Sequence, residues 1–210
     1  MSVKPRAFQG QYPPRWHSII NSPVGRLYVA ASDNALTGIW YEEQAHFPLP
    51  HELGERITDP AGLVAEADEV AQAIGADAER SGEHIYVAPA RILAQTEREL
   101  NEYFRGRRTD FEVPLDPDGT DFQLAVWDYL KTVPYGYTVT YGEISRMVGP
   151  GAPAQAVGQA VGHNKIAIII PCHRVIGAGG KLTGYAGGLD RKRWLLDREE
   201  PKDIRSGRLF

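Results

Sequence analysis

A short segment rich in proline, aspartate and glycine, residues 112–119 (EVPLDPDG), divides the chain into two halves. These residue types favour turns and connecting loops over regular structure. Residues 1–119 carry 11 Lys and Arg against 19 Asp and Glu, a formal charge of −8, whereas residues 120–210 carry 12 against 8, a charge of +4. The sequence therefore predicts two domains, residues 1–111 and 120–210, joined by a linker at 112–119. A basic second half is compatible with a surface that faces phosphates.

The first half predicts a small antiparallel sheet with helices. Its strand candidates alternate apolar and polar residues, include β-branched and aromatic types, and are separated by Asn, Ser and Pro turns. The predicted elements are strands over 15–21, 25–32 and 36–41, helices over 61–74 and 91–104, and a mobile loop over 75–84. The apolar residues of the second helix recur near one face, which is typical of an amphipathic helix.

The second half is mostly helical. Thr120-x-x-Gln123 and Thr140-x-x-Glu143 have capping-box spacing and open predicted helices over 120–131 and 141–148. Gly-Pro-Gly then leads to a helix over 152–163, with Pro153 in its first turn, and a last helix covers 189–198. The middle pair resembles a helix-turn-helix. The fold class expected is α+β, with an N-terminal sheet and helices and a C-terminal domain like a winged helix-turn-helix.

The third of these helices carries little bulk, because Ala and Gly occupy positions 154, 156, 158, 160 and 162. Each internal glycine costs a helix about 1 kcal/mol relative to alanine. A surface of this kind suits close approach to another body, and tight packing inside the protein is an equal alternative.

A single cysteine excludes an internal disulfide and any zinc site that needs two thiolates. The N-terminal residues lack a signal-peptide core, and the longest apolar run, 166–170, is far shorter than the ~20 residues of a membrane span. We therefore expect a soluble cytoplasmic protein with no membrane partner.

The cysteine itself is the informative residue. An apolar, strand-like run ends at Pro171, and Cys172, His173 and Arg174 follow. The imidazole can accept the thiol proton and Arg174 adds positive charge, and both effects favour the nucleophilic thiolate. Neighbours in a strand point to opposite faces, so a working pair requires a turn. Thiol proteases, thioester enzymes and alkyl acceptors all use such a pair. The alternative is an unreactive buried cysteine with a structural role only.

Several motifs surround this pair. They are PCHRV at 171–175, TGYAGGL at 183–189, KxWLL at 192–196 and Glu199, with Tyr141, residues 156–158 and Asn164 upstream. In these motifs the chain resembles the O6-alkylguanine-DNA alkyltransferase family, without gaps from about Val139 to Glu199. The N-terminal half matches that family only in outline.

The resemblance implies a reaction in which an alkyl group moves from guanine oxygen in DNA to the protein's own cysteine. By motif position Cys172 is the acceptor, His173 takes its proton through a water, and Glu199 orients and charge-balances the imidazole, as in a triad. The thioether product cannot be reversed, so the protein acts once. The resemblance implies no cofactor and no metal.

Further site residues follow from the same resemblance. Asn164 hydrogen-bonds backbone near the nucleophile's turn, with a plain helix C-cap as the alternative. Tyr141 donates a proton or hydrogen bond to the departing guanine and pushes on the target nucleotide's phosphate, with packing on the core as the alternative. Tyr185, Val175 and Ala186 are assigned to the pocket for the flipped base.

The expected partner is double-stranded alkylated DNA. The base must leave the stack before it can react, which costs a few kcal/mol. The family inserts the second helix of its helix-turn-helix into the minor groove, where readout is degenerate. DNA contacts are assigned to Tyr141, Gly142, Gln155, Ala156, Gly158, Lys165 and Ala178. We expect a monomer in solution; side-by-side contacts on DNA stay open, as does activity on O4-alkylthymine.

The chain departs from the family at three positions. Gln155 replaces an arginine that fills the gap left by the extruded base, Lys165 replaces a proline, and Ala186 replaces a serine found in some members. The resemblance also leaves two rival functions: a lesion-binding protein without chemistry, which Cys172 disfavours, and a thiol hydrolase, which would turn over. Scattered histidines at 17, 46, 51 and 84 make a metal site an unfavoured interpretation.

Overall fold

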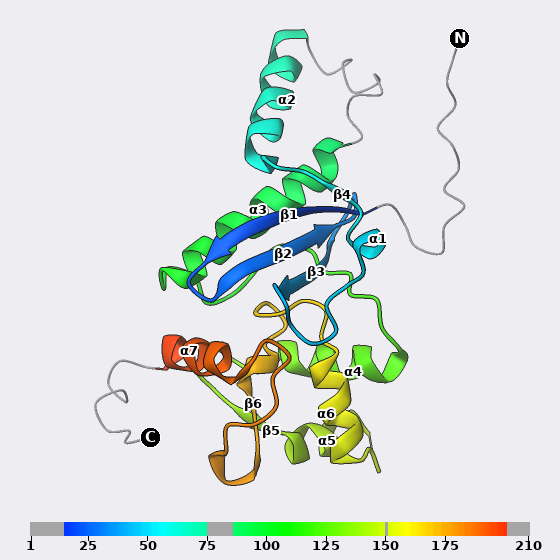
Figure 1. Cartoon of the computed structure of the whole chain (residues 1–210), viewed down its shortest axis with the longest axis vertical. Helices are drawn as coiled ribbons and strands as arrows, with labels where there is room; N and C mark the ends of the chain where they lie inside the picture. Colours follow the sequence, from blue (N-terminus) through cyan, green and yellow to red (C-terminus); the bar gives the residue numbers. More distant parts are fainter. Residues whose placement is uncertain (1–14, 75–85, 150, 201–210) are drawn as a thin grey trace.

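The computed structural model describes residues 15–74, 86–149 and 151–200. Its first half is built on a sheet in the order β3-β2-β1-β4 (Figure 1). Strands β1 (Trp16–Ser22), β2 (Gly25–Ala31) and β3 (Leu36–Tyr41) form an antiparallel meander, as the alternation predicts. Strand β4 (Glu55–Arg56) pairs with β1 in parallel, so the sheet is mixed rather than purely antiparallel.

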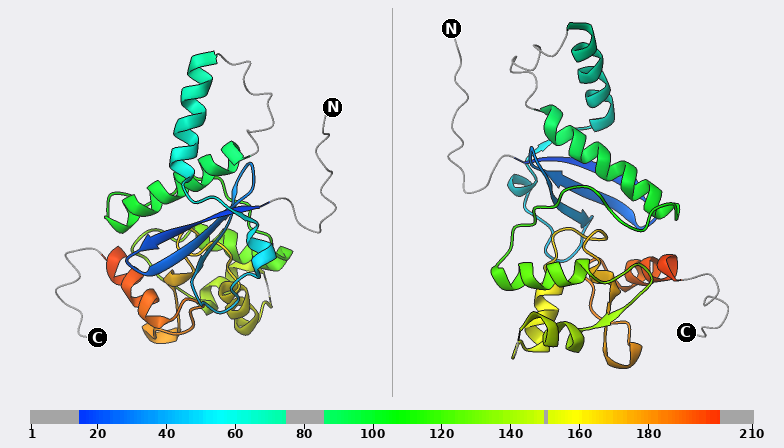
Figure 2. Two further views of the ribbon diagram at one scale, coloured as in Figure 1. Left: turned by 45° about the horizontal axis from the view of Figure 1, so that its top comes forward. Right: turned by 180° about the vertical axis from the view of Figure 1, so that it is seen from behind.

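Three helices accompany this sheet: α1 (Pro50–Leu53), α2 (Pro60–Ile74) and α3 (Val87–Phe104). Helix α3 lies across one face of the sheet, and α2 projects away from it (Figures 1 and 2). Helix α3 begins at Val87 rather than at residue 91, because a proline is tolerated in the first turn and Pro89 therefore does not delay the start. The loop predicted over 75–84 lies outside the described residues.

The second half contains α4 (Asp121–Lys131), α5 (Tyr141–Val148), α6 (Ala154–Gly162) and α7 (Leu189–Glu199). Both predicted capping boxes form, with Thr120 and Thr140 accepting from the backbone N–H three residues on. Helix α6 starts two residues later than expected, and Pro153 is its N-cap rather than part of its first turn.

A two-stranded parallel sheet joins β5 (Val139–Thr140) to β6 (Val175–Ile176). The loop that follows β6 includes the short turn Ala178–Gly180 and projects beside α5 and α6 at one end of the molecule (Figure 1). The helices together with this projecting loop confirm the α+β class, with a helical C-terminal half of winged helix-turn-helix type.

The apolar run before the cysteine is not a strand, which corrects the interpretation made from the sequence. Ile166 makes one isolated bridge to Ile39 of β3, after which the chain turns so that Ile170 N–H donates to Ile166 O at 3.0 Å. Ile168 has a φ of 71°, a conformation rarely adopted by a β-branched residue. The run is apolar because it fills the core, and not because it pairs in a sheet.

The edge of β3 supports this run directly. Ile39 N–H donates to Lys165 O at 2.7 Å, and Ala167 N–H donates to Ile39 O at 3.1 Å. The segment predicted as a linker contacts the same strand, because Leu36 N–H donates to Pro114 O at 2.8 Å. Strand β3 therefore connects the first half to the residues that precede Cys172.

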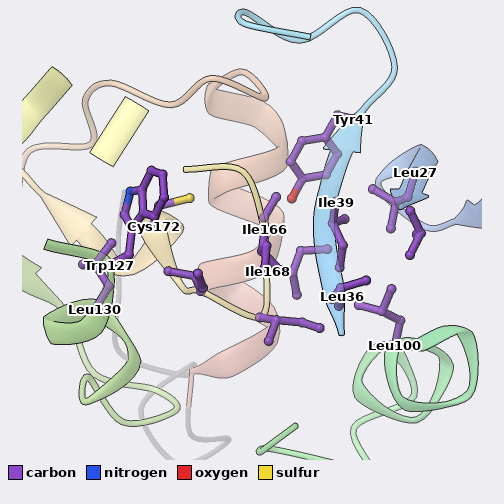
Figure 3. Close-up of a cluster of buried hydrophobic side chains, with 14 of the residues drawn as sticks. Leu27, Leu36, Ile39, Tyr41, Leu100, Trp127, Leu130, Ile166, Ile168 and Cys172 are labelled. Carbon is purple, nitrogen blue, oxygen red and sulfur yellow. The ribbon is translucent and has the colours of Figure 1, made fainter. Parts of the chain in front are cut away.

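Buried residues from both halves form one continuous hydrophobic cluster. Figure 3 shows it extending from Leu27 and Ile39 in the sheet, through Ile166, to Trp127 and Cys172. The two halves share this core, and the division into domains at 112–119 stays a prediction. In the described part of the chain, no helix has the length and apolar character needed to cross a membrane.

Candidate active site

Cys172 lies in a single 3₁₀ turn, Cys172–Arg174, that follows Pro171. The turn supplies the geometry that a strand could not, since it lets neighbouring side chains take part in one network. Cys172 is 6% exposed and His173 is fully buried. The nucleophile candidate is therefore held inside the protein, close to its surface.

Asn164 holds this turn and also contacts the sulfur. Its Nδ2 donates to Cys172 Sγ at 3.0 Å and to Ile170 O at 2.8 Å, and its Oδ1 accepts from Ile166 N–H at 3.1 Å. The backbone hydrogen bonds expected of Asn164 are thus present, and the C-cap of α6 is His163. Contact with the sulfur itself was not expected from the sequence.

Burial outweighs the contacts that stabilise the thiolate, so the pKa of the Cys172 thiol lies above its ordinary value. The hydrogen bond from Asn164 and the charge of Lys192 act in the opposite direction and lower the pKa. Groups that stabilise the thiolate of a buried cysteine favour the form that acts as the nucleophile.

His173 and Glu199 form the expected pair. His173 Nε2 lies 2.8 Å from Glu199 Oε1, and both side chains are buried. A carboxylate can only accept, so Nε2 carries a proton and Nδ1 is left with a lone pair. Burial lowers the pKa of His173 despite Glu199, which favours the neutral ring. The Nδ1 atom has no hydrogen-bond partner among the described residues and is available to accept a proton.

Arg174 has a carboxylate partner that the sequence did not predict. Its guanidinium pairs with Glu199, through Nε to Oε2 at 2.7 Å and Nη2 to Oε1 at 3.0 Å, and its effect on the thiol stays a prediction. Glu199 also accepts from the Tyr103 hydroxyl at 2.8 Å. Burial alone would raise the pKa of Glu199, but the hydrogen bonds and charges of His173 and Arg174 outweigh it and hold the pKa well below its ordinary value.

Lys192, which lies in a motif to which the sequence assigned no role, adds a positive charge that lowers the pKa of the Cys172 thiol. Its side chain is fully buried on α7, and Nζ donates to the carbonyls of Val175, Thr183 (2.6 Å) and Gly184 (3.0 Å). Burial lowers the pKa of Lys192 to about 8, opposed by the charge of Cys172. Its helical spacing with Leu195 and Glu199 is the signal that could have identified it, because these positions share one face.

The residues assigned to the base pocket differ in exposure. Tyr185 is half-buried, and its hydroxyl lies 2.8 Å from that of Tyr41. The Val175 side chain is fully buried in β6, and the backbone carbonyl of Val175 accepts a hydrogen bond from Lys192 Nζ. Ala186 O accepts from Ala45 N–H at 3.2 Å, a further contact between the halves.

Tyr141 begins α5 and lies beside this site. Its hydroxyl is 3.5 Å from Gly184 O, and its ring faces Gly158 of α6. Burial, and then the charge of Cys172, raises the pKa of the Tyr141 phenol. The half-buried ring packs against the core, as the packing alternative predicts, and the role of Tyr141 toward guanine stays a prediction.

The residues assigned to DNA contact lie on α5, on α6, between α6 and the reactive turn, and on the projecting loop. Gln155 on α6 and Ala178 on the loop are exposed. Gly142, Ala156 and Gly158 are half-buried. Lys165 Nζ lies 3.2 Å from Asp118 Oδ2, so its ammonium is engaged in an ion pair.

Comparisons with known proteins agree with this geometry. Residues 121–201 match the family model described as 6-O-methylguanine DNA methyltransferase, DNA binding domain. Methylated-DNA–protein-cysteine methyltransferase from Mycobacterium tuberculosis is 42% identical over 183 residues, 87% of this chain and 91% of that protein. The protein of the same name from Methanosarcina acetivorans is 52% identical over 114 residues, 54% of this chain and 73% of that protein.

Among solved structures, Mycobacterium tuberculosis OGT in complex with DNA superposes with a TM-score of 0.67 at 41% identity, covering 90% of this chain and 97% of that one. The M. tuberculosis O6-methylguanine methyltransferase gives 0.66 at 39% identity, covering 91% and 98%. The similarity extends over both halves and includes the turn that carries the thiol, and so the chain belongs to the methylated-DNA–protein-cysteine methyltransferase family.

Proposed function

We propose that the protein repairs DNA by transferring the alkyl group of O6-alkylguanine to Cys172 in one irreversible event. The observation that carries this proposal is the network at the reactive turn. Cys172 Sγ receives a hydrogen bond from Asn164, while the adjacent imidazole keeps Nδ1 free and holds Nε2 on a charge-balanced Glu199. That arrangement suits a thiol that must lose its proton and then attack.

The proposed step balances in atoms and protons. The thiol proton passes through a water to His173 Nδ1, and the sulfur attacks the alkyl carbon. The S–C bond forms as the bond from carbon to guanine O6 breaks, and the electron pair of that bond leaves with guanine. Tyr141 donates its hydroxyl proton to the guanine, which stays in the DNA strand as the repaired base, and the proton taken up by His173 then returns to Tyr141 through water.

The product is a thioether that the protein cannot resolve. The chain has no second cysteine, and a general base does not reverse S-alkylation. One molecule therefore repairs one lesion. We propose that it acts as a monomer.

Access to the lesion requires that the base leave the helix, and we assign this task to α6. Its small residues permit close approach to a minor groove, and Gln155 is exposed at its first turn. Gly142, Ala156, Gly158 and Ala178 are proposed to face the DNA backbone around the extruded nucleotide, with Tyr185, Val175 and Ala186 around the base. O4-alkylthymine is a second candidate substrate, since it presents the same alkyl–oxygen bond.

The test is to incubate the protein with duplex DNA containing O6-methylguanine and to weigh the intact protein. Transfer adds one methyl group, about 14 Da, to the wild type and nothing to Cys172→Ala. Tight binding with unchanged mass would instead support a lesion-binding protein. Unchanged mass with repeated cleavage of a thioester would support a hydrolase.

A further inference from the structure

Arg191 lies on α7, in the second half of the chain, and its side chain contacts both halves. Its Nε donates to Val24 O at 2.8 Å, in the turn between β1 and β2, and its Nη1 donates to Gly187 O at 2.9 Å. Its guanidinium carbon also lies 5.0 Å from the centroid of the Tyr41 ring, at the end of β3. One side chain of the second half thus meets the sheet of the first half at two places.

These contacts hold two distant parts of the backbone at a constant separation. A guanidinium is planar and presents its N–H groups in a rigid fork. One branch of the Arg191 fork is bonded to a carbonyl of the first half and another to a carbonyl of the second, and the aromatic face of Tyr41 favours the cation between them. Figures 1 and 2 show the turn between β1 and β2 beside α7 in every view. The fork is satisfied only while the turn and Gly187 keep this arrangement.

Gly187 is the last residue of the segment 183–187, which we call the pocket segment because it contains Tyr185 and Ala186, both assigned to the pocket for the flipped base. Neighbouring residues of α7 hold the two ends of this segment. Lys192 Nζ donates to its first two carbonyls at 2.6 and 3.0 Å, and Arg191 Nη1 donates to its last. Lys192 acts within the second half, whereas Arg191 also ties the segment to the sheet of the first half.

The backbone that Arg191 holds is packed tightly against the pocket. Gly187 is buried, and a Cβ at this position would lie 2.5 Å from Tyr41 Cδ2 and 2.9 Å from Tyr185 Cε1. The two rings meet at an edge beside it, with centroids 5.9 Å apart and hydroxyl oxygens 2.8 Å apart. Because closely packed groups transmit small displacements, a shift of the Gly187 backbone moves the Tyr185 ring. The hydrogen bond from Arg191 therefore controls the position of a pocket side chain.

We propose that Arg191 is a positioning residue for the base pocket: by joining Val24 O to Gly187 O it fixes the pocket segment against the sheet, ready for the alkylated base. The inference rests on the proposed function of the protein in alkyl transfer. A pocket that is already ordered spares the base the cost of ordering it on binding, so Arg191 raises affinity for the lesion. The hydrogen bonds at Cys172 and His173 come from other side chains, so transfer from a bound base is independent of Arg191.

The test uses Arg191→Met, which keeps an unbranched stem and removes the charge and both donors. The variant should need about three- to tenfold more duplex containing O6-methylguanine to reach half of its maximal transfer rate, the amount that one ordinary hydrogen bond contributes. The maximal rate itself should stay at the wild-type value, because the lost interaction acts on binding of the base and not on the chemical step.

Two substrates separate the pocket from the DNA surface. The first is the duplex, used over a series of concentrations in single-turnover reactions that are followed by the mass of the intact protein. The second is the free base O6-methylguanine, which enters the pocket without any contact to a phosphate. Its second-order rate constant should fall in Arg191→Met by the same factor as the affinity for the duplex. The free base is uncharged, so the loss of a positive charge does not by itself change this rate.

Arg193→Met is the matched control, because it removes the same charge from an exposed position of the same helix. It should react with the free base at the wild-type rate. Arg191→Lys keeps the charge but replaces the rigid fork by a point donor, so its half-saturating concentration should lie between those of the wild type and Arg191→Met. A wild-type value for Arg191→Lys would mean that charge alone suffices, and would overturn the bridging role.

Two other results would overturn the proposal. One is that Arg191→Met and Arg193→Met give the same curves with both substrates. The other is a smaller fraction of reacting protein at an unchanged half-saturating concentration, which is the result expected if Arg191 only stabilises the fold. Failure of the proposed function looks different, because the wild type itself would then gain no methyl group from either substrate and both proposals would be wrong.

Discussion

Glu199 is the residue on which the charges of the site converge. It accepts from His173, Arg174 and Tyr103 with 2% of its surface exposed. Replacement by glutamine leaves the Arg174 charge buried without its counterion, a change that typically costs about 3–5 kcal/mol. We expect Glu199→Gln to unfold at markedly lower urea concentration and to transfer methyl groups slowly. Glu112→Gln removes a carboxylate that is 77% exposed and should change stability little. Equal midpoints for the two variants would contradict this account.

The same carboxylate predicts how stability responds to acid. The ordinary pKa of Glu199 is 4.5 and its folded value lies well below this, so the unfolded chain binds a proton more readily. Glu199 therefore contributes stability above pH 4.5, and this contribution is lost as the pH falls toward the folded pKa. The wild-type free energy of unfolding should fall more steeply below pH 4.5 than that of Glu199→Gln. Urea titrations at a series of pH values measure both slopes, and parallel slopes would refute the prediction.

At the residue scale, the sequence identified the site residues that lie in its motifs and missed the contacts between residues that are distant in sequence. Cys172, His173, Glu199 and Asn164 follow from local spacing and resemblance. The partner of Arg174 and the place of Tyr41 did not follow, because Glu199 and Tyr185 lie far from them in sequence and meet them only through the fold. Side-chain type and neighbours along the chain do not encode such contacts.

At the scale of elements, helices were predicted better than the connections between them. The helices α4 and α5 start where their capping boxes predict, because a cap is a local interaction. Strand β4 and the run at 166–170 were missed or misread, since their form depends on pairing with β1 and β3. Apolar content alone did not distinguish a buried turn from a strand.

Helix α6 offers a test of how the extruded base is stabilised. Gln155 occupies the position where the family carries arginine, and its side chain is exposed. We expect Gln155→Arg to bind duplex DNA more tightly and to transfer methyl groups faster, because the longer cation fills the gap and neutralises phosphate. Affinity by fluorescence anisotropy and single-turnover rates measure the two effects.

Gln159→Arg adds the same charge one turn further along α6, at another exposed position. It should raise affinity in a salt-dependent way but leave the transfer rate unchanged. If the two variants behave alike, general electrostatic attraction explains the gain and the gap-filling role of position 155 is wrong.

At the scale of the whole molecule, the charge asymmetry and the shared core describe different things. The first half carries −8 and the second +4, which predicts separate surfaces, one of them suited to DNA. The interior shows no such division, because the sheet, the run at 166–170 and the helices of the second half contribute to one hydrophobic cluster. Composition therefore indicated where the net charge changes along the chain. It could not show that β3 hydrogen-bonds the segment that precedes Cys172.

This shared core predicts that the two halves unfold together. Trp16 and Trp40 report on the first half, and Trp127 and Trp194 on the second. One variant replaces the first pair by phenylalanine and another replaces the second pair, so that each keeps fluorescence from one half. Within each variant, the fluorescence midpoint in urea should coincide with the midpoint from far-ultraviolet circular dichroism, as a single cooperative transition requires. Fluorescence that changes before or after the backbone signal would mean that the halves are stable independently. In that case the contacts of β3 with the segment before Cys172 would not couple the sheet to the reaction centre.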